Sequence, residues 1–365
     1  MKLALTGLAN SGKTTLFNAL TGLDIETTVY TTTTTDPHIG VVKVPDQRVD
    51  ELSKIYNPKK TTYATVEYID YLGLTKGDTA QNRKVFDHIK DADALVHVIR
   101  AFEDDAVVHP LEGVYPVRDY KAVETELILS DLELIEKRLV RMESGRKTGK
   151  KPDESEKKVL QKCREILEDE TPLRHVEFGE EELKAIRHLQ FISILPMINV
   201  INVSEDDLDS DKAKEWLSGI DTAVSNYPIK EMIATVLLSG KIEMEISQLS
   251  PEEAGEFLKD LGVNEPAKNM LIHESYKLLG QVSFLTVGED EVRAWTISNG
   301  TEAQKAAGKI HSDIERGFIR AEVVSYDDFI SSGNMVEVKQ KGQARLEGKT
   351  YVVRDGDIIN FRFNV

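Results

Sequence analysis

The sequence has little cysteine and no long apolar run, and both shortages limit what the protein can be. Cys163 is the single cysteine among 365 residues, so no internal disulfide can form, and this fits a reducing compartment. The longest apolar segments, such as residues 191–203, contain polar residues and do not approach the ~20 apolar residues of a membrane span. Because strand-like sequence begins almost at Met1, we expect no secretory signal, a cytoplasmic location and no membrane partner.

Positive charge is also scarce. The chain has 46 Lys and Arg against 63 Asp and Glu, which gives a net charge of −17. An evenly basic surface for nucleic acid is therefore excluded, DNA is not expected as a partner, and any RNA contact must use a local patch. Residues 281–365 have 11 basic and 13 acidic side chains, a net charge of −2, which leaves −15 for residues 1–280. The difference indicates a separate C-terminal unit with a different surface role.

A phosphate-binding loop is predicted near the N-terminus. Residues 7–14, GLANSGKT, match G-x-x-x-x-G-K-[ST] between a strand-like segment (2–6) and a helix-like one (15–20). In such a turn the backbone N–H groups point at one spot, and the helix N-terminus adds a positive dipole. Lys13 would reach the β- and γ-phosphates of a nucleotide, and the Thr14 hydroxyl would bind Mg²⁺.

Two further segments are typical of nucleotide switches. Residues 66–70 read as a strand that ends in Asp70, and residues 70–73 form D-x-x-G, so Asp70 would hold a Mg²⁺-bound water and the Gly73 N–H would contact the γ-phosphate. A threonine-rich run, 31–35, lies where a Mg²⁺-binding threonine is expected, although threonine also favours edge strands. Leu74 follows Gly73, where many GTPases have a water-orienting glutamine. Another group must position the water, or the intrinsic rate is low.

The base-reading segment differs from that of GTPases. Residues 191–200 read as a buried strand, and Asn202-Val203-Ser204-Glu205 follows where GTPases have N-K-x-D. The aspartate of that motif accepts hydrogen bonds from guanine N1–H and the 2-amino group. Here Glu205 is one methylene longer and Val203 replaces the lysine, so the guanine contact is weakened and ATP becomes a candidate. The alternative is an ordinary polar loop that ends a strand.

Two more modules are predicted. Residues 123–170 read as an antiparallel helical hairpin, broken at 145–152, whose apolar stripes contain Ile128, Leu132, Ile135, Leu139, Met142, Val159, Cys163 and Ile166. Its tip, 146–151, is basic and could contact RNA phosphates, or could be a solvated loop. The C-terminal unit alternates over 352–363 around a hairpin turn at Asp355-Gly356, with a helix over 303–315.

The chain resembles the YchF / Obg-like ATPase family of P-loop NTPases. The strongest matches are EVRAWTI (291–297), AAGKIHSD (306–313), RGFIRAE (316–322) and the end of the chain from Gly348, which are typical of that family's TGS domain, a ubiquitin-like β-grasp module. The resemblance implies an α/β fold. It places a P-loop nucleotide-binding domain over 1–122 and 185–280, an α-helical coiled-coil insertion over 123–184, and the TGS domain over 281–365.

The resemblance also assigns site residues. It implies nucleotide contacts at Gly7, Asn10, Gly12, Lys13, Thr14, Asn202, Val203 and Glu205. We expect Ser11 and Thr15, which lie in the same loop and helix start, to contact the nucleotide as well. The Mg²⁺ ligands would be Thr14, Asp70 and Thr34, which precedes Asp36-Pro37 as in the family's switch I. Beside Lys13 and Gly73, the loop histidine His109 would aid hydrolysis. Asn10 matches a position that coordinates K⁺ in some related P-loop enzymes.

The implied function is an ATP-preferring hydrolase that binds the ribosome through the TGS domain and the hairpin tip and regulates translation or the stress response. The chain departs from the family pattern at Ala9, Ser11, Leu72, residues 30–33 and residues 78–83. The resemblance is therefore that of a divergent member or paralogue. Two alternatives stay open: a GTPase of the same architecture, and a nucleotide-gated ribosome-binding module with negligible turnover.

Overall fold

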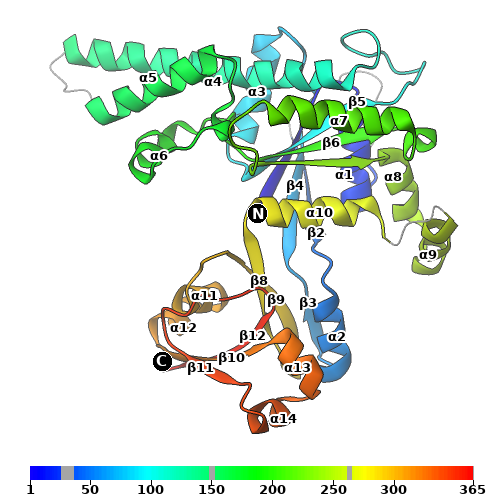
Figure 1. Cartoon of the computed structure of the whole chain (residues 1–365), viewed down its shortest axis with the longest axis vertical. Coiled ribbons are helices and arrows are strands. Elements are labelled where there is room, and N and C mark those ends of the chain that lie inside the picture. The colour runs from blue at the N-terminus through cyan, green and yellow to red at the C-terminus, as the bar shows by residue number, and fades with distance from the viewer. Residues whose placement is uncertain (26–36, 148–152, 261–264, 365) are drawn as a thin grey trace. The chain divides into compact units, whose positions relative to one another are not determined.

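The computed structural model describes residues 1–25, 37–147, 153–260 and 265–364 (Figure 1). The chain divides into two compact units, residues 1–42 with 67–271, and residues 43–66 with 272–365. The sequence placed 43–66 and 272–280 in the nucleotide-binding domain. The structure groups both segments with the C-terminal unit. Residues 43–66 belong there because strand β3 (Lys60–Thr62) pairs with β9 (Glu291–Ser298). Across the described residues, no helix combines the length and apolarity that crossing a membrane requires.

The first unit is built on a largely parallel sheet. Across it the described strands run in the order β2 (His38–Lys43), β4 (Thr65–Asp70), β1 (Lys2–Thr6), β5 (Ala94–Ala101), β6 (Met197–Val203) and β7 (Ile233–Leu238). The central pairs, from β4 through β1, β5 and β6 to β7, are parallel. All residues of β5 and β6 are buried, as expected of strands covered on both faces. The carboxyl ends of β1, β4, β5 and β6 therefore meet at one edge, where such sheets bind ligands.

Helices and short 3₁₀ turns lie between these strands and, from α8 on, after the last of them. They are α1 (Lys13–Thr21), α3 (Thr79–Ile89), α4 (Pro116–Lys147), α5 (Glu154–Glu168), η1 (Leu173–His175), α6 (Glu180–Ile186), η2 (Arg187–Leu189), η3 (Glu205–Asp207), α7 (Asp211–Ser225), α8 (Gly240–Gln248), α9 (Pro251–Asp260) and α10 (Ala267–Leu278). The core between the sheet and α3, α4 and α7 contains Val85, Phe86, Tyr120, Val123 and Ile220.

The expected strand over 191–200 is wrong in its first half. Strand β6 begins only at Met197. The backbone N–H groups of Ile192 and Ser193 donate to the buried carboxylate of Asp131 at 3.0 and 2.8 Å, and Phe191 packs in the core of the helical hairpin. These contacts bend the chain. The start of the apolar run therefore packs in the core of the helical hairpin, and its end packs in the core of the parallel sheet.

The helical hairpin forms as predicted. Helices α4 and α5 lie side by side, and Ile128, Ile135, Val159 and Cys163 are buried between them (Figure 1). Burial raises the pKa of the Cys163 thiol to about 12, so this residue is a packing group. Helix α4 begins at Pro116, before the expected boundary, and its first turns belong to the core of the nucleotide-binding domain. Of the basic tip predicted at 146–151, residues 146 and 147 end α4, and residues 148–151 lie outside the described residues.

The C-terminal unit contains a second sheet, with the strand order β11 (Arg345–Glu347), β10 (Phe318–Ser325), β12 (Asp357–Phe363), β8 (Gln281–Thr286), β9 and β3. Helix α11 (Ala303–Ile310) packs Ala303, Ala306 and Ala307 on it, which gives the β-grasp architecture. The other helices are α2 (Gln47–Tyr56), α12 (Ser312–Arg316), α13 (Tyr326–Ser332) and α14 (Met335–Gln340).

Two local predictions for this unit need correction. The helix expected over 303–315 breaks at His311, which is extended (φ −163°) and whose ring nitrogen Nδ1 accepts from the Asp313 N–H to cap α12. A turn does occur at Gly356 (φ +79°), but no hairpin forms there among the described residues. Val352 makes only an isolated bridge, and β12 pairs with β10 and β8 instead.

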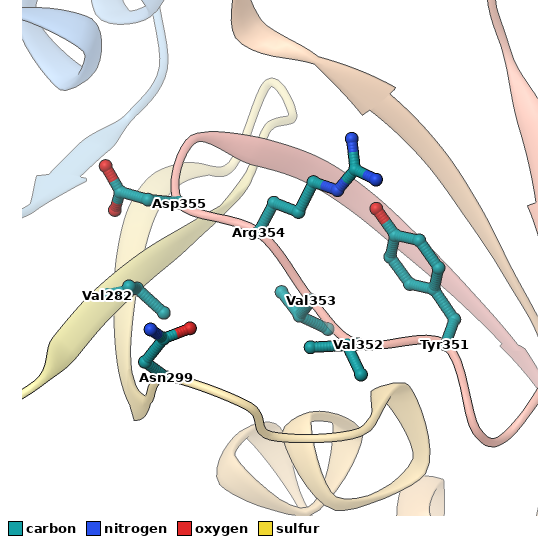
Figure 2. Close-up of a pocket in the computed structure, with 7 residues that line it drawn as sticks. All are labelled: Val282, Asn299, Tyr351, Val352, Val353, Arg354 and Asp355. Atoms are coloured by element: carbon teal, nitrogen blue, oxygen red, sulfur yellow. The ribbon is translucent and has the colours of Figure 1, made fainter.

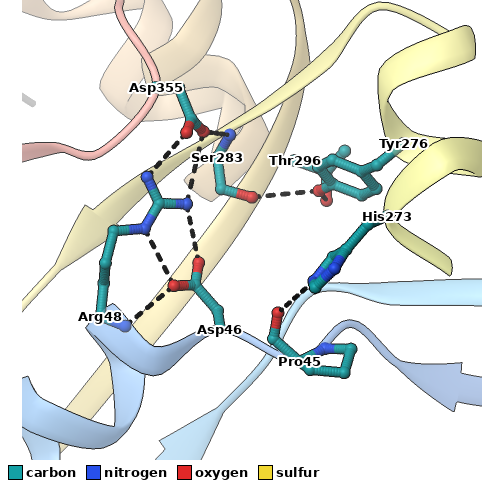
Figure 3. A network of polar contacts seen from close by, with 8 residues as sticks. All are labelled: Pro45, Asp46, Arg48, His273, Tyr276, Ser283, Thr296 and Asp355. Atoms are coloured by element: carbon teal, nitrogen blue, oxygen red, sulfur yellow. Dashed lines mark hydrogen bonds and ion pairs between the residues drawn. The ribbon is translucent and has the colours of Figure 1, made fainter. Parts of the chain in front are cut away.

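A polar network fastens residues 43–66 within this unit (Figure 3). The Arg48 guanidinium donates to Asp46 at 2.9 Å and to Asp355 at 2.7 Å, and Asp355 also accepts from the Ser283 N–H. His273 lies within hydrogen-bonding distance of the Pro45 carbonyl, 3.2 Å away. The segment between the two predicted switch regions is thus held by side chains from distant parts of the chain.

A groove of about 610 Å³ lies on the same unit (Figure 2). Val282, Val352 and Val353 form its apolar part, and Asn299, Tyr351, Arg354 and Asp355 complete the lining. The Tyr351 hydroxyl and the Asp355 carboxylate are already engaged, with Asp357 and with Arg48, so these two lining groups have structural roles.

Candidate functional site

The predicted phosphate-binding loop connects β1 to α1 and has the backbone that only glycine supports. Gly7 and Gly12 have φ of +140° and +92°. A Cβ on Gly7 would lie 2.4 Å from the Val98 carbonyl oxygen, and one on Gly12 would lie 2.2 Å from Asn202 Nδ2. At both positions a side chain is therefore excluded twice, by the positive φ of the backbone and by the atoms that an added Cβ would meet. The loop leads directly into the N-terminus of α1, as the motif requires.

Lys13 lies inside this loop. Its side chain is buried, and Nζ donates to the Leu8 carbonyl at 2.8 Å and to the Gly7 carbonyl at 3.4 Å. Burial lowers the pKa of Lys13 to about 8, against the opposing attraction of the Asp70 carboxylate. Within the described chain the hydrogen bonds of this buried ammonium go to carbonyl oxygens, so it gains much from an anion, and the loop favours a phosphate at this place.

Thr14 and Asp70 meet as expected of Mg²⁺ ligands. The Thr14 hydroxyl donates to Asp70 Oδ2 at 2.8 Å, across 56 residues of sequence. Asp70 is buried, its pKa is raised by that burial, and its other oxygen Oδ1 has no hydrogen-bond partner within the described chain. A hydroxyl and an under-satisfied carboxylate are hard oxygen donors, so the residues fit Mg²⁺. Thr34, the third predicted ligand, lies outside the described residues.

The D-x-x-G segment is bonded to the phosphate-binding loop. The Leu74 N–H donates to the Gly7 carbonyl at 2.9 Å, and the Ala9 N–H donates to the Leu74 carbonyl at 3.1 Å. The Leu74 side chain is fully buried in the core, so it takes no part in orienting water. Gln81, which the sequence reading did not single out, donates through Nε2 to the Gly73 carbonyl at 3.2 Å. Gln81 lies outside the D-x-x-G motif, so the motif did not predict this contact.

Gly73 provides a sharp test of this arrangement. In Gly73→Ala, the new Cβ would lie 2.5 Å from Ala9 Cα and 2.9 Å from Lys13 Nζ. Since a displacement of about 1 Å near the reacting atoms can cost about 10²-fold in rate, we expect nucleotide hydrolysis to fall about tenfold or more. Phosphate release at saturating nucleotide measures it. Gly255→Ala is the matched control, because nothing lies within 4 Å of its added Cβ. Equal rates in both variants would count against the placement of Gly73.

The base-reading segment is joined to the loop through Asn202. Its Nδ2 donates to the Ser11 carbonyl at 3.1 Å, and its Oδ1 accepts from the Gly240 N–H at 2.8 Å. Asn202 is the penultimate residue of β6, and the Val203 side chain is buried, so only the Val203 backbone could reach a base. Glu205 is exposed and begins η3. The structure therefore brings Asn202 to the phosphate loop, while Glu205 is exposed after the end of β6.

Two residues next to the groups that Asn202 contacts were missed from sequence. Ser239, between β7 and α8, is buried and its hydroxyl has no partner in the described chain. Phe102, just after β5, lies under the Arg100 guanidinium, 4.6 Å from its ring centroid, and beside Gly12. An aromatic ring at this edge can pack on a base. The available signal was positional: both residues directly follow strands of the parallel sheet.

His109 lies close to the phosphate loop but is fully engaged. Its Nε2 lies 2.8 Å from Asp119 Oδ2, and its Nδ1 accepts from the Leu111 N–H at 3.1 Å. Together with Leu8, Ala9 and Ser11, His109 and Asp119 line a small cavity. Burial lowers the pKa of His109, while the Asp119 carboxylate acts in the opposite direction, so we take the ring as neutral near pH 7.

Asn10 has the left-handed backbone of the loop (φ +61°), and its Nδ2 donates to the Val108 carbonyl at 3.0 Å. The amide oxygen is the atom that a K⁺ ion would use. Thr15, half-buried in the first turn of α1, and Ser11, buried in the loop, complete the predicted set. Apart from Thr34 and the exposed Glu205, the predicted residues from Gly7 to Asn202 converge on one edge of the sheet.

Two family models match the chain. One is described as a 50S ribosome-binding GTPase and matches residues 2–132. The other, for the C-terminal domain of YchF GTPases, is described as a protein of unknown function and matches residues 281–364. The first model covers the phosphate-binding loop, the D-x-x-G segment and β3. The second covers the other strands of the C-terminal sheet.

Full-length relatives and solved structures agree with these models. The chain is 43% identical to a ribosome-binding ATPase YchF of Bacillus subtilis, over 99% of this chain and 98% of that protein. It is 39% identical to one of Escherichia coli O157:H7, over 100% and 99%. The structure of the Schizosaccharomyces pombe YchF GTPase superposes with a TM-score of 0.82 at 29% identity, over 99% and 97% of the two chains. A GTP-binding protein of Pyrococcus horikoshii shares the fold, with a TM-score of 0.60 at 18% identity. The chain belongs to the YchF family.

Proposed function

We propose that the protein is a Mg²⁺-dependent ATPase that changes conformation with bound nucleotide and associates with the ribosome. The observation that carries this proposal is the buried cradle of Gly7, Gly12 and Lys13, with Thr14 and Asp70 beside it, in a chain similar over its full length to proteins named ribosome-binding ATPases. We further propose that it acts in the cytoplasm and regulates translation or the stress response.

In the proposed reaction a water oxygen bonds to the γ-phosphorus of ATP while the bond to the β–γ bridging oxygen breaks. The electron pair of that bond leaves on ADP, one water proton stays on the released phosphate, and the other passes to solvent. Lys13 would leave its two carbonyl partners and stabilise charge on the phosphate oxygens. The Gly73 N–H would hold the γ-phosphate, and Asn202 would keep the base segment against the loop.

Mg²⁺ held by Thr14 and Asp70 would neutralise charge on the β- and γ-phosphates. Thr34 stays a predicted third ligand, and Asn10 a predicted ligand of K⁺. His109 is proposed as the group that orients water, in place of the buried Leu74.

ATP is the proposed substrate because Glu205 and Val203 replace the aspartate and lysine that read guanine. The competing candidate is GTP, which the descriptions of the two solved structures favour, since one is named a GTPase and the other a GTP-binding protein. A third reading is a nucleotide-gated ribosome-binding module with negligible turnover.

Side-by-side calorimetry with Mg²⁺ and ATP or GTP tests the choice of nucleotide. We expect ATP to bind at least about tenfold more tightly than GTP. A single polar contact that forms with one base and not with the other can cause a difference of this size. Tighter binding of GTP would favour the GTPase. Phosphate release at saturating ATP then separates an ATPase from a module that only binds.

For the ribosome contact we propose the TGS domain and the tip of the helical hairpin. The support is a charge of −2 on residues 281–365 in a chain of charge −17, with exposed basic side chains such as Arg316, Arg320 and Arg354. Near-neutral charge lets this unit approach RNA without the repulsion that the rest of the chain would meet.

A further inference from the structure

Both ring nitrogens of His109 are occupied. Nδ1 accepts the Leu111 N–H, so Nδ1 carries no proton and the neutral ring is protonated at Nε2, which donates to Asp119 Oδ2. The ring is buried, and neither nitrogen has a lone pair or a proton left for a water molecule. One of these two bonds must break before His109 can take part in hydrolysis.

The bond to Asp119 is the stronger of the two. It joins a buried carboxylate to a buried ring at 2.8 Å, whereas the Leu111 contact is a neutral bond of 3.1 Å that any local loop movement carries along. The Arg118 Nε donates to Asp119 Oδ1 at 2.9 Å, which fixes the carboxylate with its other oxygen toward the ring. Asp119 also lies in the first turn of α4, where the helix dipole stabilises a negative charge.

Arg118 organises the loop that carries His109. Its guanidinium donates to the carbonyls of Leu111, Glu112 and Gly113, each at 2.9 Å, and lies 4.8 Å from the centroid of the Tyr115 ring. Glu112 and Gly113 both have left-handed backbones, so the loop turns tightly back toward α4. The His109 loop is therefore preformed around one helix end rather than around the nucleotide.

We propose that Asp119 is a positioning residue that acts as a latch, holding His109 away from the reacting water until the latch opens. The inference rests on the proposed ATPase function and deepens it. It predicts a low basal turnover, caused by a retracted histidine and not only by the missing glutamine at position 74. Asp119 lies in the first turn of α4, and the same helix continues into the helical hairpin.

The test is phosphate release from Mg²⁺-ATP by the full chain in four forms: wild type, Asp119→Ala, His109→Ala and the double variant. Opening the latch should raise turnover by several-fold to about tenfold, the shift expected when the reactive state is a minor population. The double variant should match His109→Ala, because the gain requires the released ring. A merely structural role for Asp119 would lower turnover whether or not His109 is present.

Asp119→Ala should fold, since Arg118 is 36% exposed and keeps its three carbonyl acceptors. Asp119→Asn is the conservative variant: its single amide oxygen can accept from His109 Nε2 or from Arg118 but not from both, and it has no charge, so we expect an intermediate gain. Nitrogen-15 spectra of the histidine rings, with His109 identified by its absence in His109→Ala, should show a fixed Nε2–H tautomer in the wild type and tautomer averaging in Asp119→Ala.

Three results would overturn the latch: no gain in Asp119→Ala and Asp119→Asn, a gain that survives in the double variant, or an unchanged tautomer. Failure of the proposed function looks different. In that case the wild type binds ATP no better than Lys13→Ala or releases no phosphate in any form. A wild type with normal turnover but no gain in the variants refutes the latch alone.

Discussion

The Lys13→Ala protein is expected to release phosphate from Mg²⁺-ATP at least about 10²-fold more slowly than the wild type, the usual loss when one preorganised cationic or hydrogen-bond donor is removed from charge that develops in the transition state. Lys13 is the buried ammonium of the cradle, held at 2.8 Å by the Leu8 carbonyl. Without the Lys13 ammonium, the phosphate oxygens keep the backbone N–H donors of the loop but lose the positive charge of this flexible side chain. Phosphate release at saturating ATP measures the loss.

The fold should survive this change. Burial lowers the pKa of Lys13 to about 8, so the folded protein holds the charged side chain at a cost, and alanine removes that cost. Lys214→Ala is the matched control, because Lys214 is 69% exposed on α7 and its ion pair is with Asp211 one turn away. We expect normal turnover in the control and an unchanged or higher thermal midpoint in Lys13→Ala. Turnover near the wild-type rate in Lys13→Ala would remove the basis of the proposed function.

The second large effect is on stability. Glu124→Ala is expected to lower the free energy of unfolding of the first unit by about 3–5 kcal/mol, the typical cost of leaving one buried charge without its partner. The Arg174 side chain is fully buried, and its Nη1 donates to both carboxylate oxygens of Glu124 at 2.7 Å. Its Nε donates to the Leu195 carbonyl, and its Nη2 has no partner within the described residues. Without Glu124, the buried Arg174 guanidinium keeps the Leu195 carbonyl as its acceptor within the described residues, and its charge has no partner of opposite sign.

Trp216 reports on this unit if Trp295, which lies in the other unit, is replaced by phenylalanine in every variant. Urea unfolding, monitored by Trp216 fluorescence, then measures the change in the free energy of unfolding. Glu133→Ala is the control: Glu133 is on the same helix, is 50% exposed and pairs with Lys137 one turn away, so its loss should be much smaller. Replacing Glu124 and Arg174 together by leucine should recover most of the stability. Equal stability of Glu124→Ala and Glu133→Ala would contradict a structural role for the pair.

Local sequence determined the elements that depend on short-range physics. The phosphate loop could be predicted because a strand, a glycine turn with positive φ and a helix N-terminus are consecutive in the chain. The helical hairpin could be predicted because apolar residues repeat at helical spacing on both of its helices. The strand predicted over 191–200 was wrong in its first half, because that apolar run packs in two different cores. An apolar pattern does not show which partner a side chain packs against.

Tertiary structure alone decided the contacts between distant residues. Asn202 reaches the phosphate loop across 191 positions, Arg174 reaches Glu124 across 50, and β3 joins a sheet whose other strands begin at Gln281. The bond between His109 and Asp119 spans only ten positions, yet it forms because a loop and a helix end pack together. The sequence by itself therefore determined which groups can do the chemistry, because motif residues are neighbours along the chain. Only the folded chain decided which of them are free to act, because hydrogen-bond partners are set by packing.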